Sequence, residues 1–193
     1  FNNNISAPAY QEGTLFYDNV NKTLAYYTDN QDVTLNIGQE TWVRVINQTG
    51  ALIPNGRAVY VSGASGAFPQ VTMAIANSIT TSRVIGIATH DISQGELGYI
   101  TINGIVHDVN TNGMTVGAPV YLSPTTPGAF TTTRPEHPYY DVELGYVTRA
   151  NTNTGAIEVQ VRSSVFNQLM VGGNANFEAN VTIDGSLNVT GST

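Results

Sequence analysis

Short stretches of alternating apolar and polar residues run through most of the chain, separated by turn-forming Gly, Asn, Asp and Pro. A period of two is typical of half-buried β-strands, because successive side chains point to opposite faces. The stretches predicted to be strands span residues 14–17, 23–27, 33–37, 42–46, 98–102, 104–109 and 157–161. Asn103-Gly104 is predicted to be a turn between two of them, and the segment 71–79 is compatible with a short helix or a loop. We therefore predict an all-β chain that opens with a hairpin.

The middle of the chain contains one pattern twice. The sequence NGRAVYVSGASGAF (55–68) matches VGAPVYLSPTTPGAF (116–130), and further along Gly86 of RVIGIAT matches Gly145 of VELGYVT. Because the spacing between matched residues hardly changes, we predict two copies of one β unit. The turns that follow one another at short intervals favour a β-sandwich or a small barrel. A Gly inside a strand indicates a bulge or a close approach of two backbones.

The last part of the chain consists of six-residue units with apolar residues at the first and third positions. The final two units read VTIDGS and LNVTGS, and LMVGGN and ANFEAN precede them with the same spacing. The first and third side chains of a unit lie on one side of a strand and form an apolar stripe. The residues of this stripe are Leu169, Val171, Phe177, Val181, Ile183, Leu187 and Val189. One chain cannot bury so narrow a stripe, whereas three chains can meet along a threefold axis.

These patterns divide the chain into three predicted parts. They are an N-terminal hairpin segment at 1–38, a duplicated β module at 39–164 with copies at about 39–110 and 111–164, and a stem at 165–193. We predict that the stem is a homotrimeric β-helix-like or β-prism structure and the start of a longer shaft. The alternative is a hairpin that packs back on the β module.

The composition excludes several classes of partner. Only 11% of the residues are charged and the net charge is −7, so the chain lacks the clustered Lys and Arg that nucleic acids and anionic membranes require. Without cysteine it has neither disulfides nor thiolate metal sites. No apolar run approaches the roughly 18 residues of a membrane-spanning helix. We therefore expect no nucleic-acid binding and no membrane insertion.

Candidate catalytic residues are few. The adjacent pairs His90-Asp91 and His107-Asp108 are the best candidates, but adjacent strand residues face opposite sides and no third ligand has a recognisable spacing. His137 lies in a Pro-stiffened loop. The carboxylates are scattered singly, and the sequence contains no nucleophile or phosphate-binding motif. We therefore expect no enzymatic activity, no metal site and no cofactor.

Tyrosines suggest one candidate contact surface. Tyr139 and Tyr140 lie in the same Pro-rich loop as His137, and Tyr is common in contacts with glycans and proteins. Tyr60 and Tyr121 occupy equivalent places in the two copies, which favours a structural role. We predict that Tyr139 and Tyr140 contact a receptor or another partner.

Residues 13–71, 83–111 and 116–159 together resemble the β-rich modules of tailed-bacteriophage structural proteins, notably tail fibres. The closing NANFEANVTIDGSLNVTGST is similar to the stem repeats that often follow such modules. The GxxVYVS pattern also resembles small capsid-decorating proteins, which are trimeric β modules. The resemblance implies a trimeric virion protein that contributes to host attachment, and it supplies no catalytic residues.

From the residues and the resemblance we expect a homotrimeric component of a tail fibre or another external appendage of the virion, assembled in the host cytoplasm. Its expected partners are itself, other virion proteins and a glycan or protein of the host surface. A capsid-decoration or head-fibre protein is the first alternative. A polysaccharide-degrading tailspike module is the second, and it requires paired carboxylates that the sequence cannot place.

Overall fold

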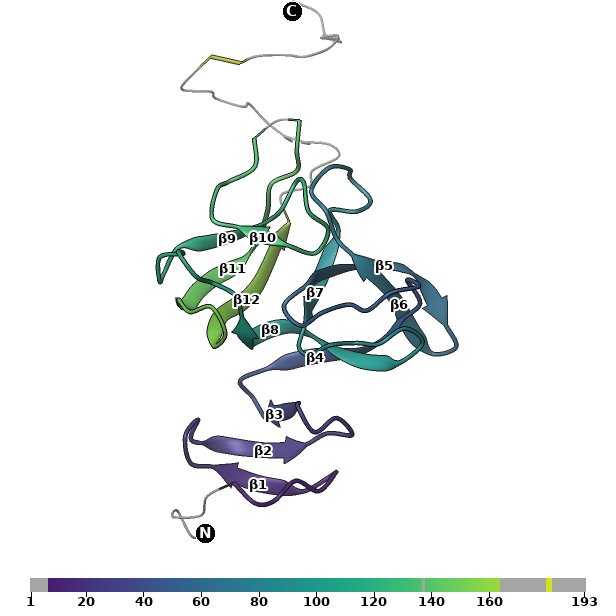
Figure 1. Cartoon of the computed structure of the whole chain (residues 1–193), viewed down its shortest axis with the longest axis vertical. Helices are drawn as coiled ribbons and strands as arrows, with labels where there is room; N and C mark the ends of the chain where they lie inside the picture. The colour runs from purple at the N-terminus through teal and green to yellow at the C-terminus, as the bar shows by residue number, and fades with distance from the viewer. Residues whose placement is uncertain (1–6, 137, 164–179, 182–193) are drawn as a thin grey trace, which may run out of the picture.

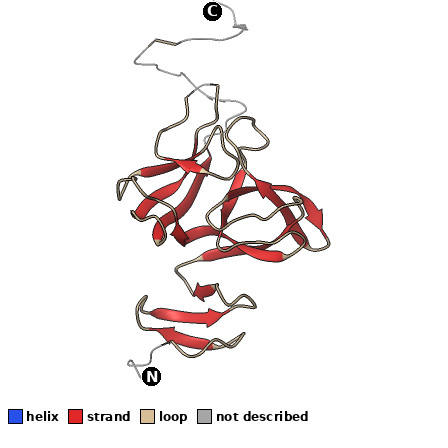
Figure 2. Cartoon of the chain, in the orientation of Figure 1, coloured by secondary structure: helices blue, strands red, loops and turns tan. Residues whose placement is uncertain are grey.

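The computed structural model describes residues 7–136, 138–163 and 180–181. Within these ranges all regular structure is β-strand and no helix is present (Figure 2). The all-β prediction is confirmed for this part of the chain. The segment 71–79 contains the end of a strand, up to Met73, and then turns, so of the two alternatives the loop is observed. None of the described residues forms a helix that could cross a membrane.

A small antiparallel sheet of three strands forms the N-terminal end of the molecule (Figure 1). Its strands are β1 (Leu15–Asp18), β2 (Thr23–Tyr27) and β3 (Thr34–Asn36). The Asp18 carboxylate shapes the β1–β2 turn by accepting hydrogen bonds from the backbone N–H of Val20 at 2.7 Å and of Asn21 at 3.1 Å. This is the local bonding that makes Asp a turn residue, and it explains the predicted hairpin.

The remaining strands form one mixed sheet of nine strands. They are β4 (Thr41–Asn47), β5 (Ala58–Ser65), β6 (Phe68–Met73), β7 (Val84–Ala88), β8 (Leu97–Val109), β9 (Pro119–Leu122), β10 (Phe130–Thr131), β11 (Val142–Arg149) and β12 (Gly155–Ser163). Their order is β10-β9-β11-β12-β8-β4-β6-β5-β7, and β7 also pairs with β8. That pairing closes β8, β4, β6, β5 and β7 into a five-stranded barrel. Neighbouring strands of this barrel are antiparallel, except that β4 and β6 run parallel.

The two halves of the sheet repeat the same pairings. In the first half Val59 of β5 lies opposite Gly86 of β7, and in the second half Val120 of β9 lies opposite Gly145 of β11. The strand order β6-β5-β7-β8 thus returns as β10-β9-β11-β12. The second half is an open sheet, because no pairing joins β10 to β8 within the described residues. Of the two predicted architectures for the module, a sandwich or a small barrel, the barrel therefore describes the first half only.

Glycine at the matched positions allows two strands to come close. A Cβ at Gly86 would lie 2.6 Å from the carbonyl oxygen of Thr101 on β8, and one at Gly145 would lie 1.8 Å from that of Glu158 on β12. Gly145 also has a φ of +146°, which an L side chain rarely adopts. The recurring apolar-Gly-apolar pattern is thus explained by the same close contact in each half.

The predicted turn at Asn103-Gly104 is wrong, because both residues lie inside the 13-residue strand β8. Gly104 has a φ of +124°, and a Cβ there would lie 2.8 Å from Cγ of Glu40. The glycine therefore bends a continuous strand instead of ending it. The bend lets β8 serve both halves: residues 97–103 pair with β4 and residues 103–109 pair with β12.

Two apolar clusters hold the nine-stranded sheet together. One fills the barrel and contains Val45, Ile53, Val59, Val71, Ala88, Ile92 and Ile100. The other joins the outer side of β5 and β7 to the second half of the sheet and includes Ala58, Ala74, Ile87, Val120, Leu122, Leu144, Ile157 and Val159. Because the second cluster takes residues from both copies, the two copies form a single packed block.

Candidate functional site

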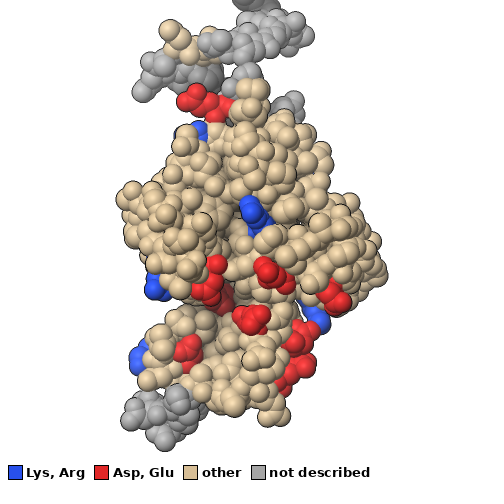
Figure 3. Space-filling view, in the orientation of Figure 1, with Lys and Arg blue, Asp and Glu red and all other residues tan. Residues whose placement is uncertain are grey.

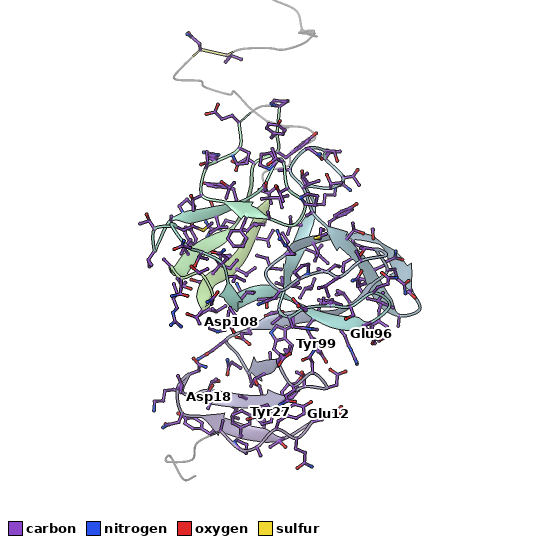
Figure 4. All side chains as sticks on the ribbon, viewed as in Figure 1. Glu12, Asp18, Tyr27, Glu96, Tyr99 and Asp108 are labelled. Carbon is purple, nitrogen blue, oxygen red and sulfur yellow. The ribbon has the colours of Figure 1, made fainter. Side chains whose placement is uncertain are left out.

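The junction between the N-terminal sheet and the barrel contains a cluster of polar and aromatic side chains. Asp29, in the loop between β2 and β3, forms an ion pair with Arg44 of β4 and accepts a hydrogen bond of 2.6 Å from the Tyr99 hydroxyl of β8. In Figure 4 Tyr99 extends from the barrel toward the N-terminal sheet. The Arg44 guanidinium lies 5.8 Å from the ring centres of both Tyr99 and Phe68, within range of cation–π attraction. Burial, followed by the hydrogen bond to Asp29, raises the pKa of Tyr99 to about 12.

His90 is a structural member of the same junction. Its Nε2 accepts the backbone N–H of Tyr99 at 3.1 Å, and its Nδ1 lies 2.8 Å from the carbonyl oxygen of Asp91 and 3.0 Å from the side-chain amide of Asn30. His90 is only 6% exposed. Burial lowers the pKa of His90, outweighing the carboxylates of Asp32, Asp91 and Asp29 that raise it. The neutral ring with Nδ1 protonated satisfies the Asp91 and Tyr99 contacts, whereas the Asn30 amide nitrogen, itself a donor, can bond only to an unprotonated Nδ1. The Asn30 side chain nevertheless places the β2–β3 loop against this ring.

The second His-Asp pair lines the same cleft as the first. This open cleft of about 670 Å³ lies between the N-terminal sheet and the barrel. Asn55 joins the two pairs, because its backbone N–H donates to the Asp91 carboxylate at 2.7 Å and its side-chain amide donates to the His107 carbonyl oxygen at 2.9 Å. His107 and Asp108 are exposed. Across the described residues no three His, Asp or Glu side chains gather closely enough to hold a metal ion.

Acidic side chains concentrate around this junction. On the face shown in Figure 3 most of the Asp and Glu side chains lie over the N-terminal sheet and the adjoining edge of the barrel. Glu40 is the most enclosed of them: burial raises its pKa, although the backbone N–H of Asn36 donates to its carboxylate at 3.3 Å. On this face the negative charge is therefore concentrated at the N-terminal end of the described residues.

The structure separates the roles of the two candidate contact tyrosines. Tyr139 is 43% exposed in the loop between β10 and β11, whereas Tyr140 packs against the apolar cluster shared by the two halves. The backbone N–H of Tyr140 also donates to the Ala76 carbonyl at 2.9 Å. Arg134 pairs with Asp141 and holds the base of this loop. Contact with a receptor or partner stays a prediction for both tyrosines.

Several candidate residues lie outside the described part of the chain. They are His137 and the stem residues Leu169, Val171, Phe177, Ile183, Leu187 and Val189. Of the predicted stripe only Val181 is described, and it is 56% exposed. The trimeric stem stays a prediction.

Sequence reasoning missed the Asp29, Arg44 and Tyr99 cluster. The three residues are far apart along the chain and no spacing connects them, so only the docking of the β2–β3 loop on the barrel brings them together. The sequence gives one hint of this cluster: Arg44 and Tyr99 both lie in stretches of alternating residues that are predicted to be strands.

The model of the phage cement protein family matches residues 37–163. The match begins directly after β3 and ends at the last residue of β12, so it covers the whole nine-stranded sheet and about two thirds of the chain. The chain belongs to the phage cement protein family. It is therefore a structural protein of the bacteriophage virion. A comparison with curated proteins finds no match.

Membership of the cement family changes the balance between the alternatives. It confirms the predicted virion class, and it favours capsid decoration over the tail fibre that the stem repeats suggested. In this chain the N-terminal sheet of β1 to β3 precedes the family region, and so does the loop that carries Asp29. The junction is thus the place where the family module meets an additional element.

Proposed function

We propose that this protein decorates the outside of a bacteriophage head as a homotrimer and stabilises the shell mechanically. The observation that carries the proposal is the match of the cement family to residues 37–163, which form one packed nine-stranded block. The shared apolar cluster and the close glycine contacts make this block suited to bearing load. The proposal assigns no catalysis to the chain, so incubation with the host surface polysaccharide is expected to release no oligosaccharide.

Binding by itself explains how such a protein stabilises a shell. A ligand that binds the assembled state and not its separated parts adds RT ln(1 + [L]/Kd) to the stability of the assembly. At a concentration one hundred times Kd this amounts to about 2.7 kcal/mol for each site. Over the many equivalent sites of a closed shell these increments add up. A trimer makes three such attachments at once, which lowers its rate of complete dissociation.

The test uses phage heads assembled without this chain. Purified protein is added, bound and free protein are separated by sedimentation, and the temperature at which the heads release their DNA is measured. Saturable binding and a rise in the release temperature are expected. Electron cryomicroscopy of the same heads is expected to show the protein on the capsid. Density or label confined to the tail would favour the tail-fibre alternative, which the stem repeats support.

The predicted stripe has its own test. Sedimentation velocity of the purified chain is expected to give a trimer. Replacing Ile183 and Val189 with Asp is expected to dissociate the trimer or prevent its formation, since each change places three like charges on the threefold axis. Thr182→Asp with Asn188→Asp, at the neighbouring polar positions, is the matched control and is expected to remain trimeric. A trimer that survives the change at Ile183 and Val189 would refute the assigned stripe.

A further inference from the structure

One face of the N-terminal sheet consists entirely of large apolar and aromatic side chains. Cross-strand pairs place Leu15 opposite Tyr26, Tyr17 opposite Leu24, and Tyr26 opposite Leu35, so these residues share a face. The outer face, as we name it, comprises Leu15, Tyr17, Leu24, Tyr26, Leu35 and Ile37. Leu15 is 60% exposed, Leu24 is 40% exposed and Ile37 is 44% exposed. A contiguous apolar surface of this kind marks an interaction site more often than scattered exposed residues do.

The opposite face of the sheet is already covered by the chain itself. Ala25 is completely buried there, and the ring of Tyr27 lies 4.7 Å from that of Phe16 and 5.4 Å from that of Tyr10. The Tyr27 hydroxyl also donates to the carbonyl oxygen of Pro8 at 2.7 Å. The residues that precede β1 therefore fold over this side. A sheet that buries one face in this way leaves the outer face as the one available for a partner.

The charges around the sheet indicate which partner fits. Residues 7–37 contain four carboxylates, at Glu12, Asp18, Asp29 and Asp32, against a single basic residue, Lys22. Glu12 and Asp18 lie at opposite ends of the sheet (Figure 4). A second copy of the chain would bring two sheets of the same net negative charge together, which is unfavourable. Asp29 is paired with Arg44, and Asp18 and Asp32 line the cleft on the other side of the sheet, so the sheet as a whole is acidic. A surface with an apolar centre and a rim of Lys and Arg complements both the apolar outer face and this negative charge.

We propose that the outer face docks on such an apolar patch with a basic rim on the external surface of the phage shell protein. This inference rests on the proposed function and names the part of the chain that makes the attachment. The sheet lies before residue 37, outside the family region. An element added to a common module is suited to recognising one particular shell, because it can vary without disturbing the barrel. The contacts among Asp29, Arg44 and Tyr99 hold the N-terminal sheet to the nine-stranded block.

The test measures binding to heads assembled without this chain. Leu15→Ser combined with Leu24→Ser removes two exposed apolar side chains from the outer face. The matched control is Val116→Ser combined with Leu52→Ser, because these residues are 60% and 45% exposed on other parts of the molecule. We expect at least about a 30-fold increase in Kd for the outer-face variant and less than about a 3-fold change for the control.

A second pair of variants tests the charged rim. Glu12→Gln with Asp32→Asn removes two exposed carboxylates beside the N-terminal sheet. Glu136→Gln with Glu158→Gln removes two exposed ones elsewhere, from the β10–β11 loop and from β12. We expect the first variant to bind more weakly and to show a smaller loss of affinity between 50 and 200 mM salt, as screening predicts. The second variant is expected to bind as the unchanged protein does.

The outcomes separate this inference from the proposed function. If the unchanged protein does not bind heads, the proposed function fails. If it binds and the Leu15 and Leu24 variant binds equally well, only the outer-face inference is overturned. If the Leu15 and Leu24 variant no longer self-associates but still binds heads as the unchanged protein does, the outer face binds a second copy of the chain. That result would also overturn the inference. A lowered urea midpoint of the free variant would show that the chain itself covers the face, with the same consequence.

Discussion

Replacing Gly145 with Ala is expected to destabilise this protein by at least about 3 kcal/mol. The new Cβ would lie 1.8 Å from the carbonyl oxygen of Glu158 on the neighbouring strand. Carbon and oxygen atoms ordinarily stay about 3.3 Å apart, so β11 and β12 would have to separate by about 1.5 Å. A shift of that size breaks adjacent backbone hydrogen bonds, and each buried group left without a partner costs about 1–3 kcal/mol. The φ of +146° adds further strain for Ala.

The assay is urea unfolding followed by far-ultraviolet circular dichroism, with the midpoint and the slope fitted separately. Gly113→Ala is the matched control, because Gly113 also has a positive φ, +77°, but a Cβ there would meet nothing within 4 Å. That control is expected to cost only about 1 kcal/mol, from the backbone alone. In thermal unfolding a loss of 3 kcal/mol corresponds to a fall in Tm of about 6–12 °C. Equal losses for the two variants would refute the close-approach explanation of the repeated glycine.

Three further predictions concern the junction and the shared core. Because the pKa of His90 is lowered in the folded protein, the stability that its neutral form contributes is complete above about pH 6.5 and is lost as the pH falls further. The urea midpoint is therefore expected to fall as the pH is lowered from 8 to 5. His90→Gln is expected to remove this fall, and His107→Gln is expected to retain it. In a spectrophotometric titration of the tyrosines, Tyr99→Phe is expected to remove one phenol that ionises near pH 12, and an unchanged curve would contradict the hydrogen bond to Asp29. Leu144→Ala is expected to cost about 2–5 kcal/mol in urea unfolding, because Leu144 is buried in the cluster that joins the two halves, and a much smaller cost would show that the halves are not packed together.

The duplication shows how far residue matching reaches. The matched Val and Gly of the two copies do pair across strands in the same way. The matched Phe residues do not: Phe68 pairs with Ser65 near the tip of a long hairpin, whereas Phe130 pairs with Leu122 and takes the place that Val71 has in the first copy. The reason is that β5 and β6 extend further than β9 and β10. Gly-Ala-Phe therefore recurs in the sequence without recurring in register.

The candidate site was predicted only in its parts. The two His-Asp pairs stood out because His and Asp are the usual carriers of chemistry, and both pairs do line one cleft. Their roles could not be read from the sequence. Whether His90 is neutral depends on the burial of its side chain and on its contact with the backbone N–H of Tyr99, and only the folded structure shows either.

The sequence by itself determined the β character of the chain and most of its strands, because alternation and turn residues act over a few neighbouring positions. It also supplied the stem pattern and the virion class. Only the tertiary structure decided that β7 pairs with β8 to close a barrel, that β4 and β6 run parallel, and that β8 continues through Gly104 into the second half. These features depend on which strand edges meet, and that choice is made by contacts between residues far apart in the chain.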